Sequence, residues 1–204
     1  MARVCEALAR ADLVKTKAGA RHILSVPEVR ALATRPALVR LATMFLGAPP
    51  IPFRATLFDK SPASNWLVAW HQDTALPVLQ RVNDSSWGPW SLKGGVLHAI
   101  APAAALARIV ALRVHLDEST HANGPLRILP GSHVRGVLTH LEIQQLADAV
   151  TPVECLSSVG GVVAMRPLIV HASSKASNAQ SRRVLHIEYA GTVHLGSDVD
   201  LAVG

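Results

Sequence analysis

Three residues in two distant parts of the chain have the types and spacing of a metal-ligand set. His71 and Asp73 are separated by one residue, and His171 follows about 100 residues later. Residues two apart on a strand point to the same face, so His71 and Asp73 can face one ion. His171 can join them only where distant strands meet, as in a barrel. Two histidines and one carboxylate leave positions open on the metal, which is typical of non-haem Fe(II) oxygenases.

The residues after His171 add a candidate anion-binding group. A small polar loop follows His171, and Arg182 opens the next apolar segment. Strand alternation puts Arg182, His186 and Glu188 on one face and Arg183 on the other. If Arg182 points into a barrel, Arg183 points out, and His186 and Glu188 become candidates for lining a pocket.

The composition predicts one folded domain over residues 1–204. The chain has 204 residues, of which 50% are hydrophobic and 17% are charged, and this excludes a disordered protein. Two cysteines are too few for a disulfide framework. Charged residues interrupt the first 13 positions, and no apolar run is long enough to span a bilayer, so we expect no targeting signal and no membrane partner. A cytoplasmic location is the default expectation.

The net charge of +6 lies in the first 60 residues, which hold ten Lys and Arg against four Asp and Glu. Such an excess can attract nucleic acid. The basic residues form no run and have few aromatic neighbours, however, which disfavours a nucleic-acid site. We interpret them as a solvated helical face and expect no nucleic-acid partner.

The hydrophobic period changes near residue 50. Residues 1–48 have helical spacing, and later segments have the alternation of strands. We predict strands at 54–58, 67–71, 107–116, 126–129, 153–156, 161–165, 168–172 and 184–190, and a helix at 142–149. On the 107–116 strand, Val110, Leu112 and Val114 share one face, and Arg113 and His115 share the other. Residues 74–106 are rich in Gly and Pro and are interpreted as a long loop that walls the active site.

These elements predict a mainly-β fold with helices. The expected core, residues 51–191, is a double-stranded β-helix, a jelly roll of the cupin type. The helical part, residues 1–48, would pack against it, and residues 192–204 would form a tail. Alternate residues of each strand line the interior of such a barrel, which suits a buried metal site.

Several short segments together resemble the phytanoyl-CoA dioxygenase family of Fe(II)/2-oxoglutarate oxygenases, from about residue 19 to residue 190. The matching segments are Phe58-Asp-Lys60, Asn65-Trp66, Trp70-His71-Gln72-Asp73, Gly88-Pro-Trp-Ser91, His115-Leu-Asp117, Asn123-Gly-Pro-Leu126, Pro130-Gly-Ser-His133, and His171 with Arg182. The resemblance implies that His71, Asp73 and His171 bind iron. It implies that Arg182 binds the distal carboxylate of 2-oxoglutarate, because a guanidinium pairs with a carboxylate in bidentate fashion.

The same resemblance suggests further site residues and a reaction. Ser173 is expected to hydrogen-bond the same carboxylate, and Thr56 is a weaker candidate. The 74–106 loop would cover the pocket, so His98 and His186 are candidates for substrate contact. The implied reaction uses O2 and 2-oxoglutarate to hydroxylate a small organic molecule, with release of succinate and CO2. Asp73 favours hydroxylation over halogenation. The enzyme would be a monomer or a homodimer.

Other functions remain open from the sequence. One is oxidative demethylation of a nucleic acid or a small N-methyl compound, which predicts salt-dependent nucleic-acid binding by the first 60 residues. Another is a non-catalytic, cupin-like metal-binding module, which would bind metal without turning over 2-oxoglutarate. A zinc hydrolase is disfavoured, because no general base can be named and Arg182 would have no role.

Overall fold

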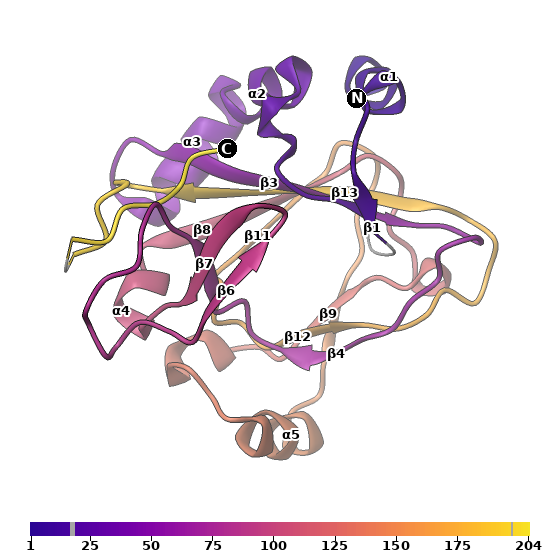
Figure 1. Cartoon of the computed structure of the whole chain (residues 1–204). Coiled ribbons are helices and arrows are strands. Elements are labelled where there is room, and N and C mark those ends of the chain that lie inside the picture. The colour runs from indigo at the N-terminus through magenta and orange to yellow at the C-terminus, as the bar shows by residue number, and fades with distance from the viewer. Residues whose placement is uncertain (17–18, 197) are drawn as a thin grey trace.

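The computed structural model describes residues 1–16, 19–196 and 198–204 (Figure 1). Helices among these residues are α1 (Ala2–Arg10), α2 (Pro27–Ala33), α3 (Pro36–Leu46), α4 (Ala103–Leu106) and α5 (His140–Ala149). The largest sheet has the order β1 (Lys15–Thr16), β2 (Gly19–Ala20), β3 (Ile51–Lys60), β13 (Arg182–Ala190), β8 (Ile109–His115) and β11 (Val162–Met165). A second sheet has the order β10 (Val153–Cys155), β9 (Leu126–Ile128), β12 (His171–Ser173) and β4 (Val68–His71). A third has the order β5 (Ala75–Pro77), β7 (Val96–Ile100) and β6 (Trp90–Lys93).

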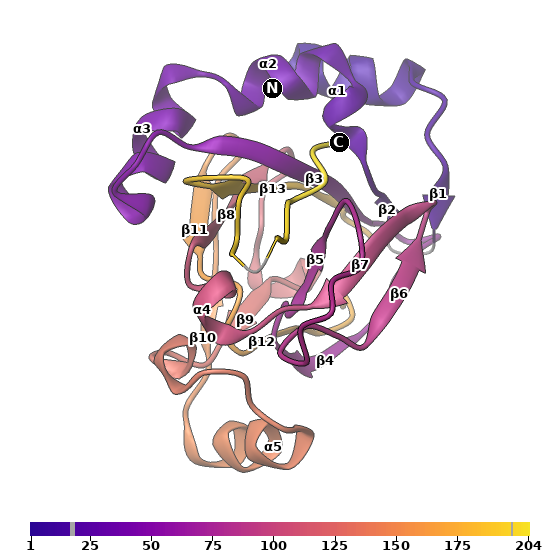
Figure 2. The ribbon, with the colours of Figure 1, turned by 60° about the vertical axis from the view of Figure 1, so that its left-hand side comes forward.

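The two larger sheets face each other and form the predicted mainly-β, cupin-like jelly roll. Figure 1 shows α1, α2 and α3 above the β3–β13 layer, and β4, β9 and β12 below it, with α5 at the bottom. Figure 2 shows the same order of layers from a second direction. The paired strands are antiparallel, as a jelly roll requires.

Strand alternation separates the helical face of the large sheet from its inner face. Val110, Leu112 and Val114 of β8 pack in one cluster with Leu32 and Ala42 of the helices. Arg113 of the same strand lies on the opposite side, next to the candidate metal site. The helices therefore bury the outer face of the sheet, and the inner face is left to line the barrel.

The long pairing of β13 with β3 and β8 places the inward residues side by side. Arg182 lies opposite Lys60, and His186 lies between Thr56 and Arg113 in register. On the outer face of β13, the buried Tyr189 donates a hydrogen bond of 3.0 Å from its hydroxyl to a backbone carbonyl of α2. This bond anchors the helices to the central strand of the sheet.

Residues 74–106 do not form the long loop that we predicted. They hold β5, β6, β7 and the short helix α4. Gly94 and Gly95, with φ values of 58° and 79°, form a two-residue turn between β6 and β7. Such turns need positive φ at both positions, so glycine here indicates a hairpin and not a flexible segment. The wall predicted as one loop is a three-stranded sheet, with residues 78–89 as the connection between β5 and β6.

The N-terminal part is also less helical than we predicted for residues 1–48. Helix α1 ends at Arg10, and residues 11–26 contain β1, β2 and a short 3-10 helix, while residues 17 and 18 lie outside the described part. Helices α2 and α3 both begin at a proline, where the missing N–H is not needed. In the described ranges, no helix combines the length and apolar character needed to cross a membrane.

Candidate metal centre and adjoining cavities

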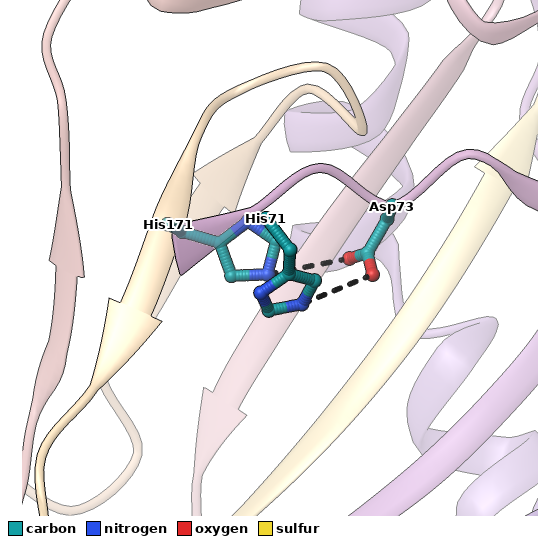
Figure 3. Close-up of side chains that lie close together, drawn as sticks. All are labelled: His71, Asp73 and His171. Atoms are coloured by element: carbon teal, nitrogen blue, oxygen red, sulfur yellow. Dashed lines mark ion pairs between the residues drawn. The ribbon is translucent and has the colours of Figure 1, made fainter. Parts of the chain in front are cut away.

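The structure brings His71, Asp73 and His171 together at the four-stranded sheet, the smaller of the two sheets of the jelly roll (Figure 3). His71 ends β4 and His171 begins β12, and the two histidines are direct partners in the antiparallel pairing. Asp73 lies two residues beyond His71. One ligand atom from each residue lies within 4.8 Å of the others. The predicted set therefore converges on one point, as a three-ligand metal centre requires.

Backbone hydrogen bonds orient both imidazole rings. Nδ1 of His71 lies 2.8 Å from the carbonyl oxygen of Ala69, and Nδ1 of His171 lies 2.9 Å from that of Ile169. Each Nδ1 must donate to its carbonyl, so Nε2 is the free ligand atom of each ring. The Nε2 atoms lie 3.8 and 3.6 Å from the two carboxylate oxygens of Asp73, too far for hydrogen bonds. This donor set fits a divalent metal ion.

The titration properties of the triad also suit a metal. Burial alone would raise the pKa of Asp73, but His171, His186, His71 and Arg54 together lower it to about 2. Burial lowers the pKa of His171 to about 4. At neutral pH, Asp73 is a carboxylate and His171 is a neutral imidazole, which are the protonation states that bind metal.

A small cavity of about 70 Å³, here called the inner cavity, opens from the triad. Its polar lining comes from His71, Asp73, Arg113, His171, Ser173 and Arg182, and its apolar lining includes Phe58, Trp66 and Leu126. Arg182, which we predicted as the carboxylate-binding residue, is only 3% exposed. Arg183 instead points away from the cavity and pairs with Asp117 at 2.8 Å.

Arg182 has unused hydrogen-bonding capacity. Its Nε donates to the carbonyl of Asn123 at 3.3 Å, and its Nη2 lies 3.4 Å from the hydroxyl of Ser173. Its buried Nη1 has no hydrogen-bond partner among the described residues. Burial, with the nearby Arg113, lowers the pKa of Arg182 to about 10. A buried guanidinium with a free donor matches an incoming carboxylate.

Lys60 lies beside Ser173 and Arg182, and the sequence analysis did not predict it as a site residue. Its Nζ donates to the Ser173 hydroxyl at 2.9 Å and lies 5.3 Å from the ring centre of Trp66. Burial, with the adjacent Arg182, lowers its pKa to about 8. Strand alternation could have identified Lys60 as an inward residue, because alternate residues of β3 face the barrel. The predicted strand ended at Phe58, one inward position before Lys60.

Arg113 is a further buried cation that the sequence reasoning placed inward without giving it a role. Its Nη1 lies 3.1 Å from Nδ1 of His186, and its guanidinium lies 5.1 Å from the ring centre of Phe58. An arginine only donates, so Nδ1 of His186 accepts and the imidazole is neutral. Burial, with Arg113 nearby, lowers the pKa of His186 to about 3. In the described part of the chain, Arg113, Arg182 and Lys60 have no carboxylate partner. The positive charges in and beside the inner cavity would favour an anion there.

A second cavity of about 310 Å³, here called the outer cavity, meets the triad from another direction. It shares His71, Asp73 and Phe58 with the inner cavity. The two candidates for substrate contact, His98 and His186, both line it. Thr56, which we expected beside Arg182, lines the outer cavity and not the inner one, because its register partner on β13 is His186. The triad thus lies where two separate chambers meet.

Comparisons with known proteins indicate a family and a fold. The family model described as phytanoyl-CoA dioxygenase matches residues 6–184. L-Proline trans-4-hydroxylase of Streptomyces griseoviridis is 28% identical over 184 residues, which cover 78% of this chain and 61% of that enzyme. The chain therefore spans less than two thirds of the length of this curated relative.

Solved structures share the fold. The crystal structure of AviO1 from Streptomyces viridochromogenes Tue57 has 27% identity and a TM-score of 0.61, with 85% of this chain and 66% of that chain covered. EctD from S. alaskensis, solved with 2-oxoglutarate and 5-hydroxyectoine, has 22% identity and a TM-score of 0.68. That match covers 92% of this chain and 64% of EctD, and it supports the fold alone.

Proposed function

The chain belongs to the phytanoyl-CoA dioxygenase family, and we propose that it is an Fe(II)- and 2-oxoglutarate-dependent oxygenase that hydroxylates a small organic substrate. The observation that carries this proposal is the convergence of a two-histidine, one-carboxylate triad with buried cations. The overall reaction converts a C–H bond, O2 and 2-oxoglutarate into an alcohol, succinate and CO2.

His71, Asp73 and His171 would hold the Fe(II) ion. Bound iron would supply the activation of O2 that drives decarboxylation of the co-substrate and oxidation of the substrate. The protein contributes ligand geometry. The backbone carbonyls of Ala69 and Ile169 fix both rings with Nε2 toward the ion. Two histidines and one carboxylate leave coordination positions for the co-substrate and O2.

The inner cavity would hold 2-oxoglutarate. Arg182 and Lys60 would bind the carboxylate distant from the metal. Ser173 accepts from both cations and donates its one proton to the Gly124 carbonyl, so it would position the two cations. Arg113 adds a positive charge near Asp73 and His171 and would attract the keto-acid end. Three buried cations without acidic partners would be costly in an empty site, and a dicarboxylate offsets that cost.

The comparisons support a small polar substrate without naming it. The relative at 28% identity is a hydroxylase of L-proline. The outer cavity, which also reaches the triad, would hold the substrate, with His98 and His186 in its wall. Separate chambers for the two organic reactants, meeting at the metal ligands, suit a reaction in which both must lie near one ion.

The test is an anaerobic titration of the protein with Fe(II) and 2-oxoglutarate, followed by the visible charge-transfer band of an Fe(II)–keto-acid complex. We expect a band in the natural protein, none in His171→Ala, and at least a tenfold higher requirement for 2-oxoglutarate in Arg182→Met. Arg183→Met is the matched control, because Arg183 is adjacent but points to the opposite face. It should behave like the natural protein.

Two results would contradict the proposal. Tight Fe(II) or Zn(II) binding without the band would indicate the non-catalytic metal-binding module. An equal loss in Arg182→Met and Arg183→Met would show that the effect is structural and not specific to the inner cavity.

A further inference from the structure

The outer cavity is lined mainly by polar side chains. Phe58, Ala75 and Ile100 are its apolar lining residues, and the other lining residues are polar or charged. A lining of this kind disfavours a long acyl chain or another extended apolar substrate, which would desolvate these groups without replacing their hydrogen bonds. A volume of about 310 Å³ suits a small metabolite.

The charges of this cavity do not balance. Its carboxylates belong to Asp73, a triad member, and to Glu188, which Arg54 binds through two nitrogens, one of them at 2.6 Å. Arg54 is therefore already paired with a carboxylate. Arg21 lies exposed at the cavity rim and Lys93 is half-buried, and neither has an acidic partner among the described residues. The lining residues Arg21, Arg54 and Lys93 thus carry three positive charges against the two negative charges of Asp73 and Glu188, so the cavity has a net positive charge.

The fold holds Arg21 and Lys93 close together although they come from distant segments. Nε2 of His22 lies 3.4 Å from the carbonyl oxygen of Lys93, so the β6–β7 hairpin contacts the residue next to Arg21. Figure 2 shows this hairpin beside the N-terminal segment. His22 has φ of 58°, in the left-handed region that is unfavourable for a non-glycine residue. Backbone strain of this kind clusters at active sites and ligand-binding sites.

Arg21 is close enough to Lys93 to affect the titration of the lysine. Burial lowers the pKa of Lys93, the positive charges of Arg21 and Arg54 lower it further, and the negative charge of Asp73 opposes this shift. A bound anion would remove this repulsion. His98 is a neutral group in the same lining, and its Nδ1 lies 3.0 Å from the carbonyl of Val96 and must donate to it. Nε2 of His98 is then an acceptor for an N–H or O–H group.

We propose that the substrate is a small amino or hydroxy acid whose carboxylate binds Arg21 and Lys93 at the wall of the outer cavity. Its N–H or O–H group donates to His98, and its remaining carbons lie toward the triad. The inference extends the proposed function, because it assigns a substrate class to the same oxygenase site.

The experiment uses the anaerobic Fe(II)–2-oxoglutarate complex and a panel of L-amino acids and 2-hydroxy acids, each paired with its primary amide. Matching phosphate monoesters form a third arm. Substrate binding is read from the change in the visible band, and turnover from succinate release. We expect acids to shift the band and raise succinate release, and amides to bind at least tenfold more weakly.

Variants assign the effect to the two cations. In the Arg21→Gln/Lys93→Gln double variant, the dissociation constant of an active acid should rise about 10- to 100-fold, because two charge-assisted hydrogen bonds are lost. The constant of its amide should not change. Arg108→Gln removes an exposed cation that does not line the cavity, and it should have no effect.

The outcomes separate this inference from the proposed function. Without any band, the proposed function fails and the inference fails with it. With a normal band, the inference alone is overturned if no acid shifts the band, if amides bind as well as acids, or if the double variant binds acids normally. Tighter binding of the phosphate esters than of the acids would overturn the carboxylate assignment.

Discussion

Lys60 and Arg182 share one buried hydroxyl, that of Ser173, and this sets the electrostatics of the inner cavity. A lysine whose pKa is lowered to about 8 loses its charge just above neutral pH. A carboxylate bound beside it would favour the charged form and raise that pKa again. Binding of 2-oxoglutarate should therefore be coupled to proton uptake by Lys60 once the pH exceeds about 8.

We predict that the affinity of the natural protein for 2-oxoglutarate falls as the pH rises through 8, because the free protein loses the Lys60 charge there. Lys60→Met should bind about tenfold more weakly at pH 7 and show no such fall between pH 7 and 9. Calorimetric titration with Ni(II) in place of iron measures both effects without turnover. Lys175→Met, at an exposed lysine, is the control. A pH dependence that survives in Lys60→Met would assign the proton to another group.

Among the elements near the inner cavity, the turn before β9 requires a glycine at position 124. Gly124 has φ of 67°, and its carbonyl accepts a hydrogen bond of 2.9 Å from the Ser173 hydroxyl. A Cβ at this position would lie 2.4 Å from the carbonyl oxygen of Ser174 and 2.8 Å from Nζ of Lys60. Only glycine lets this turn approach the cation cluster so closely.

Gly124→Ala should therefore both destabilise the protein and weaken 2-oxoglutarate binding by at least tenfold. Gly131→Ala is a matched control, since Gly131 also has positive φ, 77°, but a Cβ there would meet nothing within 4 Å. Gly131→Ala should cost only the backbone strain, about 1 kcal/mol, and leave binding unchanged. Chemical denaturation and co-substrate titration distinguish the two. Equal effects on binding would show that the close approach at Gly124 is unimportant.

At the level of elements, the sequence predicted what depends on local periodicity. Alternation placed Arg182 and Arg183 on opposite faces of one strand, and it divided β8 into an apolar face and a polar face; the family resemblance indicated that Arg182 is the inward residue. Prediction from periodicity failed where contacts between distant segments determine the local structure. Gly94 and Gly95 suggested a loop but form a hairpin turn. No period in the sequence could bring Arg21 beside Lys93, because the contact depends on a hairpin packing against a segment about 70 residues earlier.

In the whole molecule, the candidate site divides between the two sheets of the jelly roll. The two triad histidines lie on β4 and β12 of the four-stranded sheet, which is the smaller sheet of the jelly roll, and Asp73 lies just beyond the end of β4. The cations Lys60, Arg113 and Arg182 lie on β3, β8 and β13, all in the larger sheet. A metal ion would therefore contact only the smaller sheet. A dicarboxylate that reaches from the metal to the cations would connect the two sheets.

This division predicts two separate steps of stabilisation. Ni(II) alone should slow amide hydrogen exchange in β4 and β12, because it binds ligands on those strands. Ni(II) with 2-oxoglutarate should also slow exchange in β3 and β13, and the free energy of unfolding should rise by about 2.7 kcal/mol at 100 times the dissociation constant. In Arg182→Met, the first step should remain and the second should be much reduced at the same concentration. If Ni(II) alone protected both sheets equally, the co-substrate could not be the connection between them.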